Sequence, residues 1–202
     1  MATYAKIFLI LNLFFLFNAP VFSQNIIKAR FQKIEFATYD VNSPRIAQKD
    51  KVEINFYALI DHNGAADIQL KYIGEQEVRH ATCQLPDSIV GSLNSIFDGM
   101  KKLKSYLNFE NKNKGYHYAG YYDFVQYTYS DNDSDALCFV NPDVSHDFQK
   151  VLKMLEPFFY GTKSVKTSYT NIGDSTLSNN ILSCHKRSKY LPIIELPPPA
   201  FN

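Results

Sequence analysis

One segment of the chain alternates apolar and polar residues with the regularity of a half-buried strand. In Lys51–Ile60 (KVEINFYALI) every second residue from Val52 onward is apolar. Successive side chains of a strand point to opposite faces of a sheet, so this spacing predicts a strand with one buried face. Asp61-His62-Asn63-Gly64 follows, and Asn-Gly is the strongest short hairpin signal because both residues tolerate positive φ. The chain is therefore predicted to turn back into an antiparallel strand ending near Tyr72.

Four further segments carry strand signals. Phe31–Val41 is rich in β-branched and aromatic residues, and Val78–Leu85 follows a turn around Gly74-Glu75. The aromatic run Tyr116–Tyr129 (YHYAGYYDFVQYTY) is too β-prone for a helix, and Asp131–Asp135 turns it back into Ala136–Asn141. These segments bring the predicted sheet to about six strands.

Two segments carry the 3.6-residue period of amphipathic helices. The first is predicted over residues 88–107, where Pro86-Asp87-Ser88 supplies the start and Gly91 and Gly99 weaken the interior. Its apolar positions are Ile89, Leu93, Ile96, Phe97, Met100, Leu103 and Leu107. The second is predicted over 145–156, with Ser145 as N-cap and Pro157 as its end.

The element order is therefore ββββαββα, which predicts an α+β fold. Grouped strands joined by short turns pair antiparallel, and both helices are expected on one face of the sheet. Residues 24–160 are predicted to form a single globular domain. Residues 161–202 carry no sustained period and end in a proline run, so an extended or partly disordered tail is expected.

The first 23 residues have the three parts of a secretory signal peptide. Lys6 precedes the apolar run Ile7–Phe17, and Val21 and Ser23 stand at −3 and −1 of a cleavage site after Ser23. The alternative is a membrane anchor, but the run is much shorter than the roughly 20 residues that cross a bilayer. We expect a secreted or periplasmic protein with no integral membrane segment after cleavage.

The overall composition excludes some classes of partner. The chain has 21 Lys and Arg against 20 Asp and Glu, a formal net charge of +1. A nucleic-acid binder needs a basic surface to displace counterions, so no nucleic acid is expected as a partner.

Cys83, Cys138 and Cys184 leave at least one thiol unpaired within the chain. Cys83 and Cys138 bridge only if their strands are neighbours, and Cys184 is able to pin the tail to either strand. Left free beside Lys186 and Arg187, Cys184 would be the most reactive of the three thiols. A zinc site at His80 and Cys83 is disfavoured because, in a strand, these positions point to opposite faces.

The tyrosine-rich strand is the best candidate for a binding surface. Tyr122 and Phe124 share one face with Tyr116 and Tyr118, whereas Tyr121 and Tyr127 share the other. An ordinary core needs one of these faces, and the other is either covered or exposed as a stacking platform. The candidate ligand-binding residues are Tyr118, Tyr121, Tyr122 and Tyr127.

A weak calcium candidate lies next to this strand. Asp131, Asp133 and Asp135 stand at positions 1, 3 and 5 of an EF-hand-like run, but Ala136 and Pro142 occupy the positions that need Gly and Glu. A polar hairpin turn explains the run better, and no metal or cofactor is predicted.

No catalytic signature is present: the chain has no G-x-S-x-G elbow, no H-E-x-x-H and no phosphate-binding glycine loop. We therefore expect an exported, non-enzymatic binding module for a protein, peptide or glycan. The alternative is a small hydrolase-like enzyme whose site is assembled from distant residues, such as Cys138 with His117 or His80.

Overall fold

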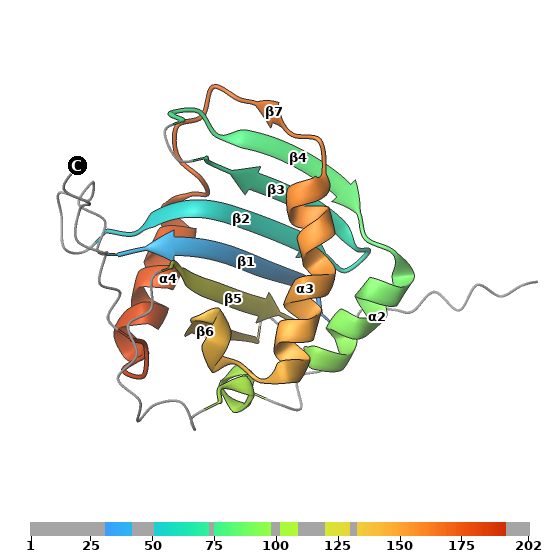
Figure 1. The fold of residues 1–202 in the computed structure, drawn as a ribbon, viewed down its shortest axis with the longest axis vertical. Coiled ribbons are helices and arrows are strands. Elements are labelled where there is room, and N and C mark those ends of the chain that lie inside the picture. Colours follow the sequence, from blue (N-terminus) through green and yellow to red (C-terminus); the bar gives the residue numbers. More distant parts are fainter. Residues whose placement is uncertain are drawn as a thin grey trace, which may run out of the picture.

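The computed structural model describes residues 31–41, 51–72, 75–97, 102–108, 120–129 and 133–192. The expected signal peptide, residues 1–23, lies outside this range. The α+β class is confirmed: one antiparallel sheet carries helices on its faces (Figure 1).

The sheet has seven strands in the order β6-β5-β1-β2-β3-β4-β7, with every neighbouring pair antiparallel. The bounds are β1 Lys33–Asp40, β2 Glu53–Asp61, β3 Ala65–Leu70, β4 Arg79–Gln84, β5 Tyr122–Thr128, β6 Ser134–Phe139 and β7 Val165–Lys166. Strands β1 to β4 follow one another across the sheet. The chain then returns to the free side of β1 with β5 and β6, and crosses to the far edge for β7.

The predicted hairpin after β2 is confirmed. Gly64 has φ +82°, its N–H donates to Asp61 O at 2.9 Å, and Asp61 Oδ1 accepts the N–H groups of Asn63 and Ala65. A Cβ added at Gly64 would lie 2.7 Å from Val90 Cγ2, so glycine is needed here for space as well as for φ.

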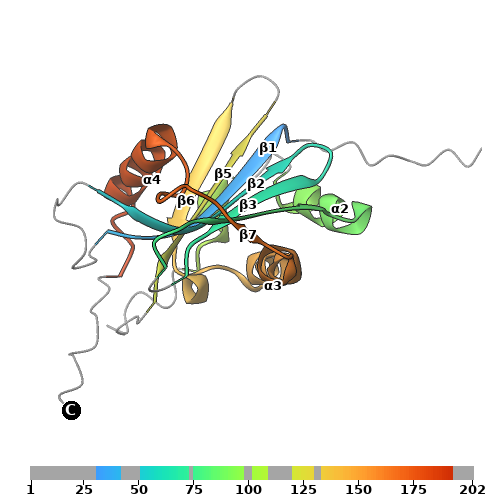
Figure 2. The same ribbon diagram turned by 90° about the horizontal axis from the view of Figure 1, so that it is seen from above.

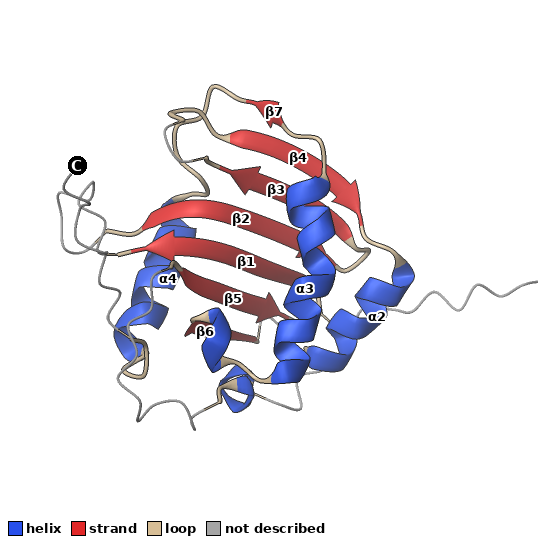
Figure 3. Cartoon of the chain, in the orientation of Figure 1, coloured by secondary structure: helices blue, strands red, loops and turns tan. Residues whose placement is uncertain are grey.

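Helices cover both faces of the sheet (Figures 2 and 3). Helix α2 (Asp87–Ile96), the 3₁₀ turn η1 (Leu103–Tyr106) and helix α3 (His146–Gly161) contribute to a large core on one face. Helix α4 (Ser175–Arg187) packs on the opposite face over a smaller core. A second 3₁₀ turn, η3 (Asn141–Asp143), links β6 to α3.

The predicted first helix is too long. Helix α2 ends at Ile96, and Lys102 has extended backbone angles before η1 begins. The N–H of Leu103 donates to Asp135 Oδ2 at 2.8 Å, which fixes the start of η1 against β6 and away from a continuous helix. Pro86 is the N-cap of α2 and makes no side-chain cap hydrogen bond.

The predicted end of the second helix is wrong. Ser145 caps α3 as expected, with its side chain accepting the N–H of Phe148, but the helix runs through Pro157 to Gly161. Proline removes one helical hydrogen bond and crowds the preceding turn. Phe159, one half-turn later, is buried against Phe36 and Phe56 with ring centroids 5.7 and 5.1 Å apart, and this packing offsets the loss.

The expectation of an irregular tail from residue 161 is wrong for the segment that forms β7 and α4. Asp174 caps α4 by accepting the N–H of Leu177 at 2.8 Å, and Leu177, Ile181 and Cys184 are its buried side chains. The apolar face of α4 thus has only about one buried side chain per helical turn. So narrow a face is sufficient here because the sheet provides the rest of the core.

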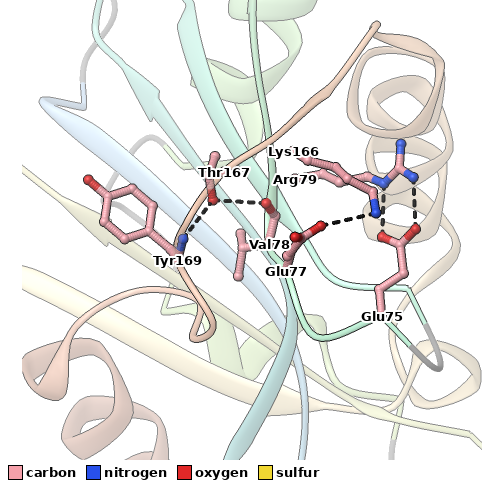
Figure 4. A network of polar contacts seen from close by, with 7 residues as sticks. All are labelled: Glu75, Glu77, Val78, Arg79, Lys166, Thr167 and Tyr169. Atoms are coloured by element: carbon pink, nitrogen blue, oxygen red, sulfur yellow. Dashed lines mark hydrogen bonds and ion pairs between the residues drawn. The ribbon is translucent and has the colours of Figure 1, made fainter.

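Strand β7 closes the β4 edge of the sheet with polar contacts (Figure 4). The Val78 N–H donates to Tyr169 O. The Val78 carbonyl oxygen accepts two hydrogen bonds from Thr167, one from its backbone N–H and one from its hydroxyl group, the latter at 2.9 Å. Beside them, Lys166 pairs with Glu77 at 3.0 Å and Arg79 with Glu75 at 2.8 Å.

Candidate functional site

The structure does not bring the candidate tyrosines together on a surface. Tyr122 and Tyr127 are each 2% exposed and belong to the cores on opposite faces of the sheet, whereas Tyr121 is 39% exposed. Tyr118 lies outside the described residues. The idea of an exposed tyrosine strip is therefore corrected at Tyr122 and Tyr127, because helices cover both faces of the strand that carries them.

The two described aspartates of the calcium candidate do not join a metal-ligand cluster. Both carboxylate oxygens of Asp135 accept backbone N–H groups, from Leu103 at 2.8 Å and from Ala136 at 3.1 Å. No group of three His, Cys, Asp or Glu side chains in the described part of the chain has the arrangement of a metal site. Asp131 lies outside that part. Asp135 instead fastens η1 to β6.

A narrow cleft of about 100 Å³ opens between α3 and strands β1, β5 and β6, and we call it the Asp123 cleft. Most of its lining is aromatic or aliphatic, with few polar groups. The lining residues are Phe36, Ala37, Thr38, Phe56, Asp123, Phe124, Phe139, Asn141, Leu152, Glu156, Phe159 and Tyr160.

Strand register places a carboxyl group in this cleft. Asp123 lies on β5 opposite Thr38 of β1 and Phe139 of β6. Alternation puts its side chain on the same face as Val125 and Tyr127, which is the face that α3 covers. An ionisable residue therefore lies on a face of β5 whose other residues, Val125 and Tyr127, belong to the hydrophobic core.

The environment of Asp123 favours its protonated form. Thr38 Oγ1 donates a hydrogen bond to Asp123 Oδ1 at 3.0 Å, and no other described residue hydrogen-bonds to this carboxyl group. Burial raises the pKa of Asp123 to about 6, and the hydrogen bond from Thr38 lowers it only in part. The cleft thus contains a carboxyl group with one satisfied oxygen in apolar surroundings.

Aromatic rings in mutual contact form one wall of the cleft. Phe159 contacts Phe36 and Phe56, and the Phe56 ring lies 5.2 Å from that of Tyr160. Tyr160 is 58% exposed, so its ring forms part of the rim. Partial burial of Tyr160, then the carboxylates of Asp123 and Glu156, raise its pKa to about 12. Its phenol therefore stays protonated at neutral pH.

A second hollow of about 460 Å³ lies on the opposite side of the sheet edge, between β6 and α4, and we call it the β6–α4 groove. It is more polar than the Asp123 cleft. Its lining residues are Lys104, Gln126, Ser134, Asp135, Ala136, Leu137, Asn180, Ser183, Cys184, Arg187, Ser188 and Tyr190.

The histidines do not form a catalytic pair with a cysteine or serine in the described part of the chain. His185 Nδ1 is 2.9 Å from Tyr39 OH, and its ring packs against Tyr39 and Tyr122. Burial lowers the pKa of His185, so its neutral form is favoured. His80 Nε2 lies 3.0 Å from Asp67 Oδ1 at the partly exposed surface of β3 and β4.

Comparison with known proteins finds no matching family model, no matching curated protein and no matching solved structure. Within the described residues, no helix combines the length and the apolar composition that crossing a bilayer requires.

Asp123 was not predicted from the sequence, because the tyrosines around it gave the stronger signal for a binding surface. The available signal was its isolation: Asp123 is the one charged residue in Tyr121–Tyr129, a segment otherwise apolar, aromatic or neutral. A lone carboxylate in a strand of this kind is either at a turn or buried with a function or partner.

Proposed function

We propose that the protein is an exported, non-enzymatic binding module and that the Asp123 cleft receives a cationic group of its ligand. The group that fits best is an amine of a protein or peptide, such as a lysine side chain. The observation that carries this proposal is the Asp123 carboxyl group, which accepts a hydrogen bond from Thr38 alone among the described residues and lies in a cleft walled by aromatic rings, with Glu156 exposed at the rim.

The chemistry of the cleft favours a cation over other ligands. Aromatic faces attract cations through their quadrupole, and a carboxylate adds a direct charge-assisted hydrogen bond. Asp123 supplies the carboxylate, and Phe36, Phe56 and Phe159 supply the rings. A cation seated at Asp123 would also stabilise the ionised form that burial disfavours.

The size of the cleft limits what enters it. About 100 Å³ suits one extended side chain or a small amine better than a folded partner or a sugar ring. The rest of a protein or peptide ligand would then lie across the rim, where Tyr160 and Glu156 are exposed.

The cleft is less suited to the hydrolase-like alternative. Its described lining contains no histidine, cysteine or serine, so it offers no nucleophile paired with a histidine base. Asp123, whose pKa is raised to about 6, has the acidity of a general acid, but among the described residues only Thr38 is hydrogen-bonded to it.

The test uses two probes that differ only by the terminal ammonium group of the side chain: Nα-acetyl-lysine amide and Nα-acetyl-norleucine amide. Calorimetry on the mature protein should detect binding of the lysine derivative in preference to the norleucine derivative. Asp123→Asn should weaken that binding roughly ten- to a hundredfold, the usual value of a charged hydrogen bond. Glu156→Gln is the matched control at the exposed rim and should change the affinity by about fivefold or less.

The same titration has a pH signature. Binding should weaken as the pH falls below about 6, since protonation of Asp123 removes the charge that holds the amine. Equal affinity for the two probes, or an Asp123→Asn variant that binds as the wild type does, would contradict the proposal.

A further inference from the structure

Two of the three cysteines lie against each other in the smaller core. Cys138 is on β6 and is 0% exposed, and Cys184 is on the sheet-facing side of α4 and is 4% exposed. The thiol of Cys138 hydrogen-bonds with the sulfur of Cys184 and also lies 3.9 Å from Ile181 O, one turn earlier in α4. Hydrogen-bonded sulfurs are farther apart than the roughly 2.05 Å of a disulfide, so a side chain has to move before the two can bond.

The two thiols have different surroundings. The pKa of the Cys138 thiol is raised, and burial is the largest cause. The hydrogen bond from Cys138, together with Ser188 and the charge of Arg187, lowers the pKa of Cys184 against the opposing effect of burial. Cys184 also lines the β6–α4 groove, next to Arg187 and across from Lys104. Cys184 therefore borders the groove, although it is largely buried, whereas Cys138 does not line the groove.

The third cysteine is too far away to pair with either. Cys83 is on β4 and packs against the larger core on the other face of the sheet. Strands β3, β2, β1 and β5 separate β4 from β6. At about 4.8 Å per strand this separation is far greater than the roughly 7 Å that a disulfide spans between Cα atoms.

We propose that Cys138 and Cys184 are a redox-active dithiol whose disulfide fastens α4 to the edge strand β6, with Cys184 as the attacking thiol and Cys83 left free. The oxidant is a disulfide, either a small-molecule disulfide or that of an oxidoreductase. This inference stands independently of the Asp123 cleft.

The reaction balances as two thiol–disulfide exchanges. The Cys184 thiolate attacks one sulfur of the oxidant R–S–S–R, forms Cys184–S–S–R and releases the first RS⁻. The Cys138 thiolate then attacks the sulfur of Cys184, closes the intramolecular disulfide and releases the second RS⁻. The two protons lost by the cysteines end on the two released thiols, so that the oxidant is reduced by two electrons. The lysine and arginine of the groove favour an anionic oxidant such as oxidised glutathione.

The experiment equilibrates the mature protein in glutathione buffers of increasing oxidised fraction and then traps free thiols by alkylation under denaturing conditions. The expected product has lost about 2 Da, the two thiol hydrogens, and carries one alkyl group. Proteolysis should join the fragments that contain Cys138 and Cys184 and should leave the label on Cys83.

Three variants separate the roles. Cys83→Ser should retain the crosslink, and Cys184→Ser should abolish it. Cys138→Ser should instead accumulate one glutathionyl group at Cys184, because the attacking thiol remains and the resolving thiol is missing. A variant that misfolds is recognised by circular dichroism, and the wild-type measurement alone still decides whether the crosslink forms.

Two results would overturn the inference. One is three alkylated cysteines in the wild type at every buffer ratio, and the other is a crosslink that includes Cys83. A glutathionyl group trapped at Cys138 in Cys184→Ser as fast as at Cys184 in Cys138→Ser would overturn the assignment of the attacking thiol.

Discussion

The two faces of the sheet are packed by different means. The face under α2 and α3 is filled by phenylalanine and aliphatic side chains, among which the Phe97 ring contacts Phe36, Tyr127 and Phe148. The face under α4 has a smaller apolar core that also contains polar groups with defined hydrogen-bond partners. Tyr39 hydrogen-bonds with His185, and Tyr122 donates to Pro192 O at 2.8 Å.

This difference indicates a division of roles between the faces. Buried apolar area stabilises in proportion to its extent and tolerates small shifts, so the larger face should carry most of the free energy of unfolding. Hydrogen bonds between side chains contribute less net energy but demand a fixed geometry. The smaller face should therefore determine where α4 sits more than whether the sheet folds.

The largest effect is expected at the centre of the larger face. Phe97 is fully buried, so Phe97→Ala should lower the free energy of unfolding by about 3–5 kcal/mol. Denaturant unfolding followed by tyrosine fluorescence and by circular dichroism should show one coincident transition for the variant. A loss below about 1 kcal/mol would show that this face is not the main source of stability.

A smaller and more local effect is expected on the α4 face. Ile181 is fully buried, but α4 can shift over the small core, so Ile181→Ala should cost about 2–3 kcal/mol, the low end for such a change. Amide hydrogen exchange should accelerate in residues 175–187 before it accelerates in β1 and β2. If helix and sheet exchange together, the two faces form one cooperative unit and the comparison fails.

The smallest effect concerns the carboxyl group at the edge of the larger face. A carboxyl whose pKa is raised to about 6 by folding binds more protons in the folded state than in the unfolded state between about pH 4 and 6. Its ionisation therefore destabilises the fold above pH 6, and this penalty disappears as the pH falls towards 4. Asp123→Asn keeps a hydrogen-bond acceptor for Thr38 and carries no charge.

At pH 7, Asp123→Asn should be more stable than the wild type by about 1–2 kcal/mol, because two pKa units correspond to at most about 3 kcal/mol and Asp123 is only partly buried. The difference should vanish near pH 4 in matched urea titrations. Asp135→Asn is the control, since Asp135 accepts two N–H groups and should gain no stability from the change. An Asp123→Asn variant no more stable than the wild type at pH 7 would contradict the conclusion that burial destabilises the ionised form of Asp123.

The sequence predicted the elements whose signals are local and regular. The alternation of Lys51–Ile60 and the Asn63-Gly64 turn specify a strand and a hairpin without reference to the rest of the chain. Ser145 likewise marks the start of α3, because its side chain accepts the N–H of Phe148, only three residues later.

The missed features depend on partners distant in sequence. Helix α4 has only Leu177, Ile181 and Cys184 as its buried face, a stripe too narrow to stand out until a sheet lies beneath it. Pro157 is tolerated inside α3 because Phe159 packs on β1 and β2, which the local sequence does not reveal. Asp123 becomes a candidate site only when α3 covers its strand.

The strands at the two ends of the sheet, β6 and β7 beside β4, affect how readily copies of this protein associate through their sheet edges. At one end, the short β7 pairs with Arg79 and His80 of β4, and the Glu77–Lys166 and Glu75–Arg79 ion pairs place charges beside it. At the other, Asp135 takes the Ala136 N–H and Tyr190 donates to Cys138 O, so part of the β6 backbone is already bonded. An approaching chain therefore meets charged side chains and partly bonded backbone at both ends, and such features disfavour the strand addition that begins edge-to-edge aggregation. We expect these features to slow association of the protein through its sheet edges.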